Sequence, residues 1–209
     1  MARQPNSFNR AKPRYKPQPT ILIICEDSKS GLNYLKDASE HFRVEAQIEI
    51  LHCGKTHPMG IIEEALERET KFDQVYCVID RDNQPRFEEA ITLAKKSQKV
   101  CVIASFPCFE FWLLLHFGHC RKPYSSIGNN SSADLLIKDL CKNSILEQYN
   151  KGNEQQIFKL LLGEKFTLAR SLSPKVLAEA IAEDNLNPST RLHILIDIFE
   201  KLSTPQPLL

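Results

Sequence analysis

The sequence predicts an α/β protein: a parallel sheet with helices on both faces, followed by a mainly helical C-terminal region. Two observations predict this class. Between residues 20 and 117, strand-like segments alternate with helix-like segments, which is typical of a parallel sheet. Most of the strand-like segments are continuous apolar runs, the pattern of strands that are covered on both faces.

The four expected strands carry two kinds of apolar pattern. Residues 20–25 (Thr-Ile-Leu-Ile-Ile-Cys), 75–79 and 100–104 are continuous runs rich in β-branched side chains. Residues 44–53 contain an alternation of apolar and polar side chains, which favours a strand with one covered face. In a doubly wound sheet the first and third of these strands can be neighbours.

Helix-like segments separate the strands. Residues 29–42 carry apolar side chains at roughly helical spacing. Helices are expected over 58–71 and 85–97. Each of these segments begins with a proline, a residue that is favoured at the first helical position. Pro107 ends the fourth strand, and 109–117 is expected to be a very apolar helix.

The chain divides into three expected parts: a flexible arm over 1–19, an α/β core over 20–120 and a helical region over 121–203. The arm holds five basic residues, four prolines and no acid, so it cannot bury enough apolar surface to offset its ordering entropy. The rest of the chain has 22 basic and 26 acidic residues. The arm either guides a polyanion toward this mildly acidic body or is a passive leader.

Apolar residues near the C-terminus form a helical packing surface, and two interpretations of it remain open. The residues are Ile181, Leu192, Leu195, Ile196 and Phe199. Part of the surface is covered by a second protein, or all of it packs on the protein's own sheet. The sequence also leaves a homo-oligomer open.

The composition excludes two classes of protein. No apolar run approaches the roughly 20 residues of a membrane span, and the polar N-terminus lacks the apolar stretch of a secretory signal. The seven cysteines are odd in number and show no C-x-x-C spacing. We therefore expect free thiols and a reducing cytoplasm, with no membrane partner.

Carboxylates follow the first and third strands. Glu26 ends the first strand, and Asp80 and Asp82 end the third. In extended chain, residues two apart point to the same side, so both aspartates can reach one cation. Like charges gathered at one sheet edge repel unless a cation lies among them, and oxygen ligands suit Mg²⁺ or Mn²⁺. Such a site can clamp phosphate oxygens and orient water for attack on a phosphodiester.

Two other patterns favour ordinary core roles. His116, His119 and Cys120 are soft ligands, but no fourth ligand follows at a familiar zinc spacing. We therefore expect His116 to be a core or boundary histidine. Trp112 and its phenylalanine neighbours are expected in the core and not in a base-stacking platform.

Residues 20–117 resemble the RloB-like family, which has a Toprim-like core, and a further match near the C-terminus extends the resemblance over nearly the whole chain after the arm. The matching segments are Ile-Leu-Ile-Ile-Cys-Glu26, Tyr34, Gly54, Tyr76-Cys-Val-Ile-Asp80-Arg-Asp82, Ser105 to Phe117 and Asn187-Pro-Ser-Thr190. The Pro-Cys-Phe-Glu-x-Trp-Leu-Leu-x-His-Phe string is the specific part. The chain departs from the family in having Asp27 where glycine is favoured and Gly31 where a second acid is frequent.

The resemblance implies a Toprim-like nuclease of prokaryotic antiviral defence, acting in abortive infection and paired with an AAA/ABC-type ATPase. It implies that Asp80 and Asp82 bind Mg²⁺ or Mn²⁺, and that Glu26 binds metal or acts as general acid or base. Glu110 is either a further metal ligand, a residue that orients the ligands from behind, or an acid favoured by its helix dipole. The alternative to a nuclease is a non-catalytic Toprim-like module that binds nucleic acid or the ATPase and regulates it.

Three basic residues are candidates for substrate phosphate. Lys55 follows Gly54 on a loop before a helix, with His57 next to it, and Lys29 and Arg81 lie beside the carboxylates. Each of them either contacts phosphate or balances the local charge. The sequence does not distinguish an RNA substrate from a DNA substrate.

Overall fold

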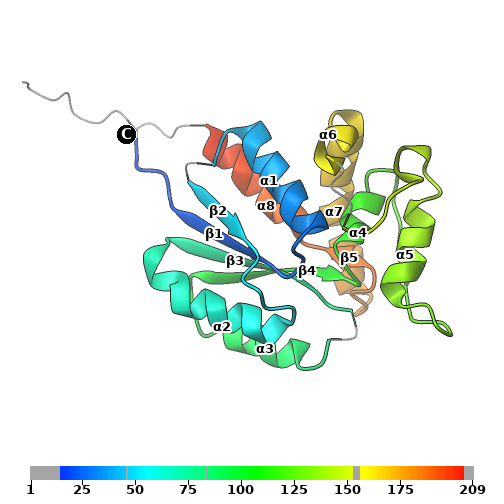
Figure 1. Cartoon of the computed structure of the whole chain (residues 1–209), viewed down its shortest axis with the longest axis horizontal. Coiled ribbons are helices and arrows are strands. Elements are labelled where there is room, and N and C mark those ends of the chain that lie inside the picture. The colour runs from blue at the N-terminus through cyan, green and yellow to red at the C-terminus, as the bar shows by residue number, and fades with distance from the viewer. Residues whose placement is uncertain (1–14, 46, 83, 153–155, 205–209) are drawn as a thin grey trace, which may run out of the picture.

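The computed structural model describes residues 15–45, 47–82, 84–152 and 156–204. The sheet of the described chain has five strands in the order β2-β1-β3-β4-β5. They are β1 (Ile21–Cys25), β2 (Ile48–Leu51), β3 (Gln74–Asp80), β4 (Val100–Phe106) and β5 (Ser189–Thr190). The first four run parallel, and β5 pairs antiparallel with β4. The predicted α/β class is confirmed (Figure 1).

Helices cover both faces of this sheet. They are α1 (Ser30–Phe42), α2 (Pro58–Arg68), α3 (Phe87–Ala94), α4 (Glu110–Leu114), α5 (Ser132–Leu140), α6 (Ile157–Leu161), α7 (Glu164–Ala182) and α8 (Leu192–Ser203), with short 3₁₀ turns η1 (Glu69–Lys71) and η2 (Ser144–Leu146). Figure 1 shows α2 and α3 on one face and α1 and α8 on the other. Helices α4 and α5 lie at the end toward which the parallel strands point.

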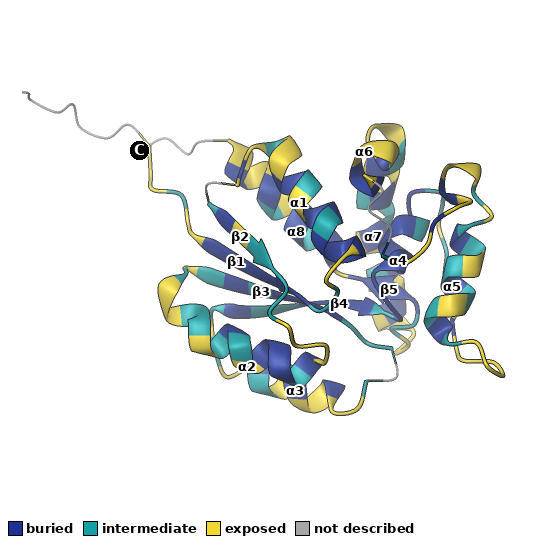
Figure 2. Ribbon diagram, viewed as in Figure 1, coloured by how far each residue is buried: buried dark blue, intermediate teal, exposed yellow. Residues whose placement is uncertain are grey.

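The two covered faces explain the continuous apolar run of β1. Leu22 and Ile24 pack in the cluster beneath α2 and α3. Ile21, Ile23 and Cys25 point the other way, into the larger cluster shared with α1, α4 and α8. Because successive strand residues face opposite sides, a strand buried on both faces has no polar positions to alternate. Figure 2 shows β1 buried along its length.

The structure shortens some expected elements and adds one. The strand expected over 44–53 is β2, Ile48–Leu51, because Arg43 turns left-handed (φ 58°) to end α1 and Val44 bonds back to that helix. The helices expected over 85–97 and 109–117 are α3 and the short α4. The two-residue β5 was not expected, since it has no strand pattern of its own.

The C-terminal packing surface is covered by the protein's own fold. The side chains of Leu192, Leu195, Ile196 and Phe199 are buried in the cluster that contains β1 and α1. Of the five expected surface residues, Ile181 alone is exposed. The interpretation that these residues pack on their own sheet therefore holds for the four of them on α8.

The residues considered for a zinc site or a base-stacking platform behave as the core prediction requires. Trp112 and His116 are fully buried, and His116 Nδ1 donates to the Trp112 carbonyl at 3.0 Å. Burial lowers the pKa of His116 to about 4, so its ring is neutral at physiological pH. His119 bonds instead to Glu179 at 2.8 Å. All seven cysteines are free thiols, as expected.

The start of the described chain lies against the end of α8. Gln18 Nε2 donates to the Leu202 carbonyl at 2.8 Å, and residues 16–19 line an apolar pocket with Ile21 and Tyr76. This part of the expected arm is therefore in contact with the fold, while residues 1–14 lie outside the described residues. Among the described helices, none combines the length and apolar character needed to cross a bilayer.

Candidate functional site

The parallel register brings Glu26 and Asp80 together at the carboxyl edge of the sheet. Cys25 of β1 lies opposite Val78 of β3, and β3 continues to Asp80. The next residue after β1, Glu26, therefore lies beside the end of β3. The expected proximity of these two carboxylates is what the structure shows, because parallel neighbours end at the same edge.

Glu26 is clamped by donors from the neighbouring strand end. Its Oε2 accepts the backbone N–H of Asp80 at 2.9 Å, and its Oε1 accepts Nε2 of Gln84 at 3.0 Å. Burial raises the pKa of Glu26 to about 7, although the hydrogen bond from Asp80 N–H favours the ionised form. Near neutral pH this carboxyl therefore exists in both protonation states, with its position fixed.

Asp80 and Glu110 add two acidic groups beside Glu26, and the ammonium group of Lys151 interacts with both of them. Glu110, at the start of α4, is fully buried: Oε1 accepts the Tyr149 hydroxyl at 2.9 Å, and Oε2 has no hydrogen bond. Lys151 Nζ lies 3.9 Å from that Oε2. Burial raises the pKa of Asp80 well above its ordinary value, and the charge of Lys151 acts against this rise.

Lys151 keeps its charge in this environment. Desolvation lowers its pKa, but the carboxylates of Glu110 and Asp80 outweigh that effect and hold the pKa above its ordinary value. The side chain remains 43% exposed. We call Glu26, Asp80 and Glu110 the acidic cluster, and Lys151 is the lysine that accompanies it.

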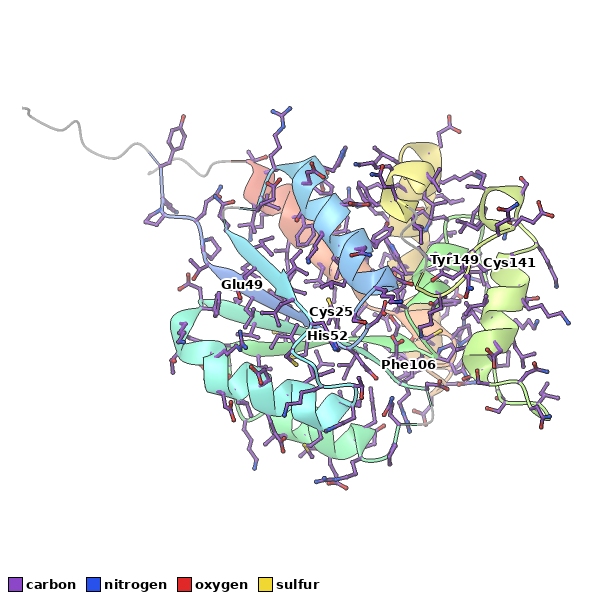
Figure 3. The ribbon with its side chains drawn as sticks, in the orientation of Figure 1. Cys25, Glu49, His52, Phe106, Cys141 and Tyr149 are labelled. Atoms are coloured by element: carbon purple, nitrogen blue, oxygen red, sulfur yellow. The ribbon has the colours of Figure 1, made fainter. Side chains whose placement is uncertain are left out.

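Sequence reasoning missed Tyr149 and Lys151. Both come from the loop after η2, far along the chain from the strand ends, and Figure 3 shows Tyr149 on the α4 and α5 side of the molecule. Gly152 N–H donates to Ser30 Oγ at 3.3 Å, which ties this loop to the start of α1. No periodicity marks such a residue, so only the fold places it at the site.

Asp82 points to a different neighbour. Its Oδ1 accepts the Ser132 hydroxyl at 2.6 Å at the start of α5, and its backbone N–H bonds the Pro107 carbonyl at 2.9 Å. Asp82 lies two residues beyond the end of β3, where the extended geometry no longer fixes its direction. Its charge still contributes to raising the pKa of Glu26.

The carboxylates of Glu26, Asp80 and Glu110 are ligands of the kind that a hard divalent ion prefers. In the structure they are not arranged close enough together to coordinate one ion. Within the described residues, no three His, Cys, Asp or Glu side chains form a group that could hold a metal ion. The buried Glu110 Oε2, however, lacks a hydrogen bond and faces a cation, and a buried carboxylate needs such compensation. Mg²⁺ or Mn²⁺ would find carboxylate oxygens of the preferred kind in Glu26, Asp80 and Glu110.

The two departures from the family pattern are neighbours in space. Asp27 Oδ1 and Oδ2 accept the backbone N–H groups of Lys29 (2.9 Å) and Gly31 (2.6 Å) at the start of α1. A Cβ at position 31 would lie 3.6 Å from Asp27 Oδ2 and 3.4 Å from the Phe109 ring. These are ordinary contact distances, so the two positions are linked by the hydrogen bond from Gly31 N–H to Asp27 and by their place at the start of α1.

The three phosphate candidates occupy different places. The stem of Lys29 packs against Gly152, beside the loop that carries Lys151. Arg81 follows β3 next to Asp82, with its guanidinium 4.9 Å from the centre of the Phe87 ring. Lys55 is exposed after the edge strand β2, and the structure gives it no contact with the acidic cluster. His57 caps α2 by accepting Gly60 N–H.

Comparison with known families finds a match to the chain. A family model described as RloB-like protein matches residues 21–199. The chain belongs to the RloB-like family. No curated protein and no solved structure gave a match.

The RloB-like segments have clear structural places. Tyr34 and His116 meet in the core, with 3.4 Å between the hydroxyl and Nε2. Thr190 of the C-terminal segment pairs β5 with β4, and its hydroxyl bonds that of Ser105 at 2.8 Å. The segments that suggested the resemblance therefore contain residues that hold the sheet edge as well as the carboxylates upon it.

Proposed function

We propose that this RloB-like protein is a metal-dependent nuclease that cleaves phosphodiester bonds of RNA or DNA. The observation that carries the proposal is the acidic cluster: Glu26, Asp80 and Glu110 lie at one edge of the sheet, and the buried Oε2 of Glu110 has no hydrogen bond and only the distant charge of Lys151 beside it. The placement at the carboxyl edge of a parallel sheet supports it, since ligands of such sheets bind there.

The proposed chemistry divides between the ion and the protein. When bound, Mg²⁺ or Mn²⁺ would polarise a phosphate oxygen and lower the pKa of a water. Glu26 has a pKa of about 7 and a fixed position, so it can take a proton from the attacking water or return one to the leaving oxygen. The half-exposed Lys151, released from the carboxylates, can face the negative charge that develops on the phosphate.

The family context extends the proposal to a Toprim-like effector of antiviral defence that works in abortive infection with an AAA/ABC-type ATPase. The alternative is a non-catalytic module that binds nucleic acid or the ATPase and regulates it. The raised pKa of Glu26 favours the nuclease, because catalytic acids and bases are tuned toward the working pH.

The test is a cleavage assay with the neighbouring ATPase supplied. Wild type, with Mg²⁺ or Mn²⁺ and mixed RNA and DNA substrates, is expected to cut, and Asp80→Ala is expected to fold and not to cut. The matched control is Asp197→Ala, an exposed acid on α8. Cleavage by Asp80→Ala at the wild-type rate would show that the acidic cluster does not carry the activity, and no cleavage by wild type would favour the regulatory module.

A further inference from the structure

A polar pocket lies next to the acidic cluster, beyond the carboxyl end of β4. It has a volume of ≈ 290 Å³, and its lining includes Arg81, Asp82, Phe106, Tyr124, Ser125 and Ser132. Asp82 borders it through the hydrogen bond to Ser132. Figure 3 shows Phe106 toward the α5 side of the sheet. The pocket is thus continuous with the residues that follow β3.

The wall of the pocket is held by contacts within the protein. Tyr124 N–H donates to Asn187 Oδ1 at 3.1 Å, and Asn187 Nδ2 donates back to the Tyr124 carbonyl at 2.7 Å. The Tyr124 hydroxyl donates to Asp139 at 3.1 Å. Asn187 begins the C-terminal family segment, and this reciprocal pair gives that residue a function: it fixes the aromatic wall in place.

Arg81 supplies a cation at the pocket. Its NH1 donates to the carbonyls of Asp82 (3.3 Å) and Gln84 (3.5 Å), which fixes the direction of the guanidinium. Its ionic contact with Glu88 is long, at 3.7 Å, and Glu88 is 78% exposed. Such an exposed pair is weak, so the guanidinium remains available to a phosphate, which arginine binds well.

The lining as a whole matches one nucleotide. Aromatic and proline surfaces suit the face of a base, serine hydroxyls suit the polar edges of a base or sugar, and Arg81 suits the phosphate. The volume is near the lower end of small-molecule pockets, which begin at about 300 Å³. A single nucleotide can enter such a space, whereas a base that stays stacked in a duplex cannot.

We infer that this pocket binds one unstacked nucleotide of a single-stranded polynucleotide, beside the phosphodiester presented to the acidic cluster. The inference rests on the proposed function and adds the substrate class to it. The strand leaves the pocket past Asp82, so the adjoining phosphate lies toward Asp80.

The test measures binding of labelled oligonucleotides to the full chain in EDTA, where cleavage is absent. One sequence is used as single-stranded RNA, single-stranded DNA and a duplex. Single strands are expected to bind more tightly than the duplex, and the RNA and DNA arms identify the preferred sugar. Ser125→Trp fills the pocket from an exposed position and is expected to weaken single-strand binding about tenfold, the loss of one stacked base.

Two further variants keep the test decisive. Thr92→Trp, on the exposed side of α3 in a separate groove, is the matched control and is expected to bind like wild type. Arg81→Gln is expected to weaken binding and to reduce its salt dependence by about one phosphate contact. This variant tests the pocket even if Ser125→Trp fails to fold.

The outcomes separate the pocket from the nuclease proposal. Wild-type single-strand binding by folded Ser125→Trp and by Arg81→Gln would overturn the pocket assignment, and so would equal binding of duplex and single strands. Calorimetry with Mn²⁺ tests the acidic cluster separately: Ser125→Trp is expected to bind the ion like wild type. No Mn²⁺ binding by wild type would overturn the proposed function, whatever the oligonucleotides do.

Discussion

Lys151→Met is expected to destabilise the metal-free protein and to make Mn²⁺ more stabilising than it is in wild type. The change keeps most of the apolar stem and removes the ammonium that lies 3.9 Å from Glu110 Oε2. A fully buried carboxylate then lacks its compensating charge, which costs about 1–3 kcal/mol of unfolding free energy. For a chain of this size, that lowers the melting temperature by about 2–4 °C for each kcal/mol.

Added Mn²⁺ should reverse this loss, because the ion and the ammonium compete for the same carboxylates. An ion present at about 100 times its dissociation constant stabilises by about 2.7 kcal/mol. Urea unfolding of wild type and Lys151→Met, each in EDTA and in Mn²⁺, measures both effects. Lys175→Met, at an exposed position on α7, is the matched control and should change neither.

A second variant identifies the source of the effect. Combining Lys151→Met with Glu110→Gln removes both charges, while the glutamine carbonyl can still accept the Tyr149 hydroxyl. The double variant should recover most of the lost stability in EDTA and respond less to Mn²⁺. Equal stability of wild type and Lys151→Met in EDTA would show that the ammonium does not compensate Glu110.

Glu26→Gln is expected to retain the fold and to lose cleavage about 10²–10⁴-fold, the usual contribution of a general acid or base. Glutamine can accept the N–H of Asp80 through its carbonyl, and the Gln84 amide can rotate to accept the new NH₂ group. The substitution therefore removes proton transfer and leaves the geometry. Cleavage at the wild-type rate would assign Glu26 to structure alone.

The same variant should alter how stability depends on pH. The pKa of Glu26 is about 7 in the fold and near its ordinary value of 4.5 in the unfolded chain, so the folded state holds the proton more tightly. Wild type therefore loses stability from this group as pH rises from about 4.5 to about 7. In EDTA, Glu26→Gln should lack that loss and gain stability relative to wild type across the window.

The strand ends could be predicted from the sequence because a parallel sheet relates them simply. Two apolar runs identified β1 and β3, and the residues that follow such runs meet at one edge, which placed Glu26 next to Asp80. The helical C-terminal region was likewise expected from its apolar spacing, and α8 packs by that spacing.

The rest of the site depends on contacts between distant segments. Lys151 and Tyr149 reach Glu110 only because the loop after η2 folds over the start of α1. Asp82 follows the strand too late for strand geometry to fix its direction, and Ser132 determines it. The two-residue β5 exists because Thr190 pairs with Ser105 of β4. None of these has a local sequence signal.

The most direct test of the acidic cluster as a cation site is the position of Mn²⁺ in a crystal. Crystals grown with Mn²⁺ and measured near the manganese absorption edge locate the ion by its anomalous signal. We expect a peak within coordination distance of the Asp80 and Glu110 carboxylates, with Lys151 moved away from Glu110 Oε2. A well-occupied peak elsewhere, or none, with Lys151 still beside Glu110, would contradict it.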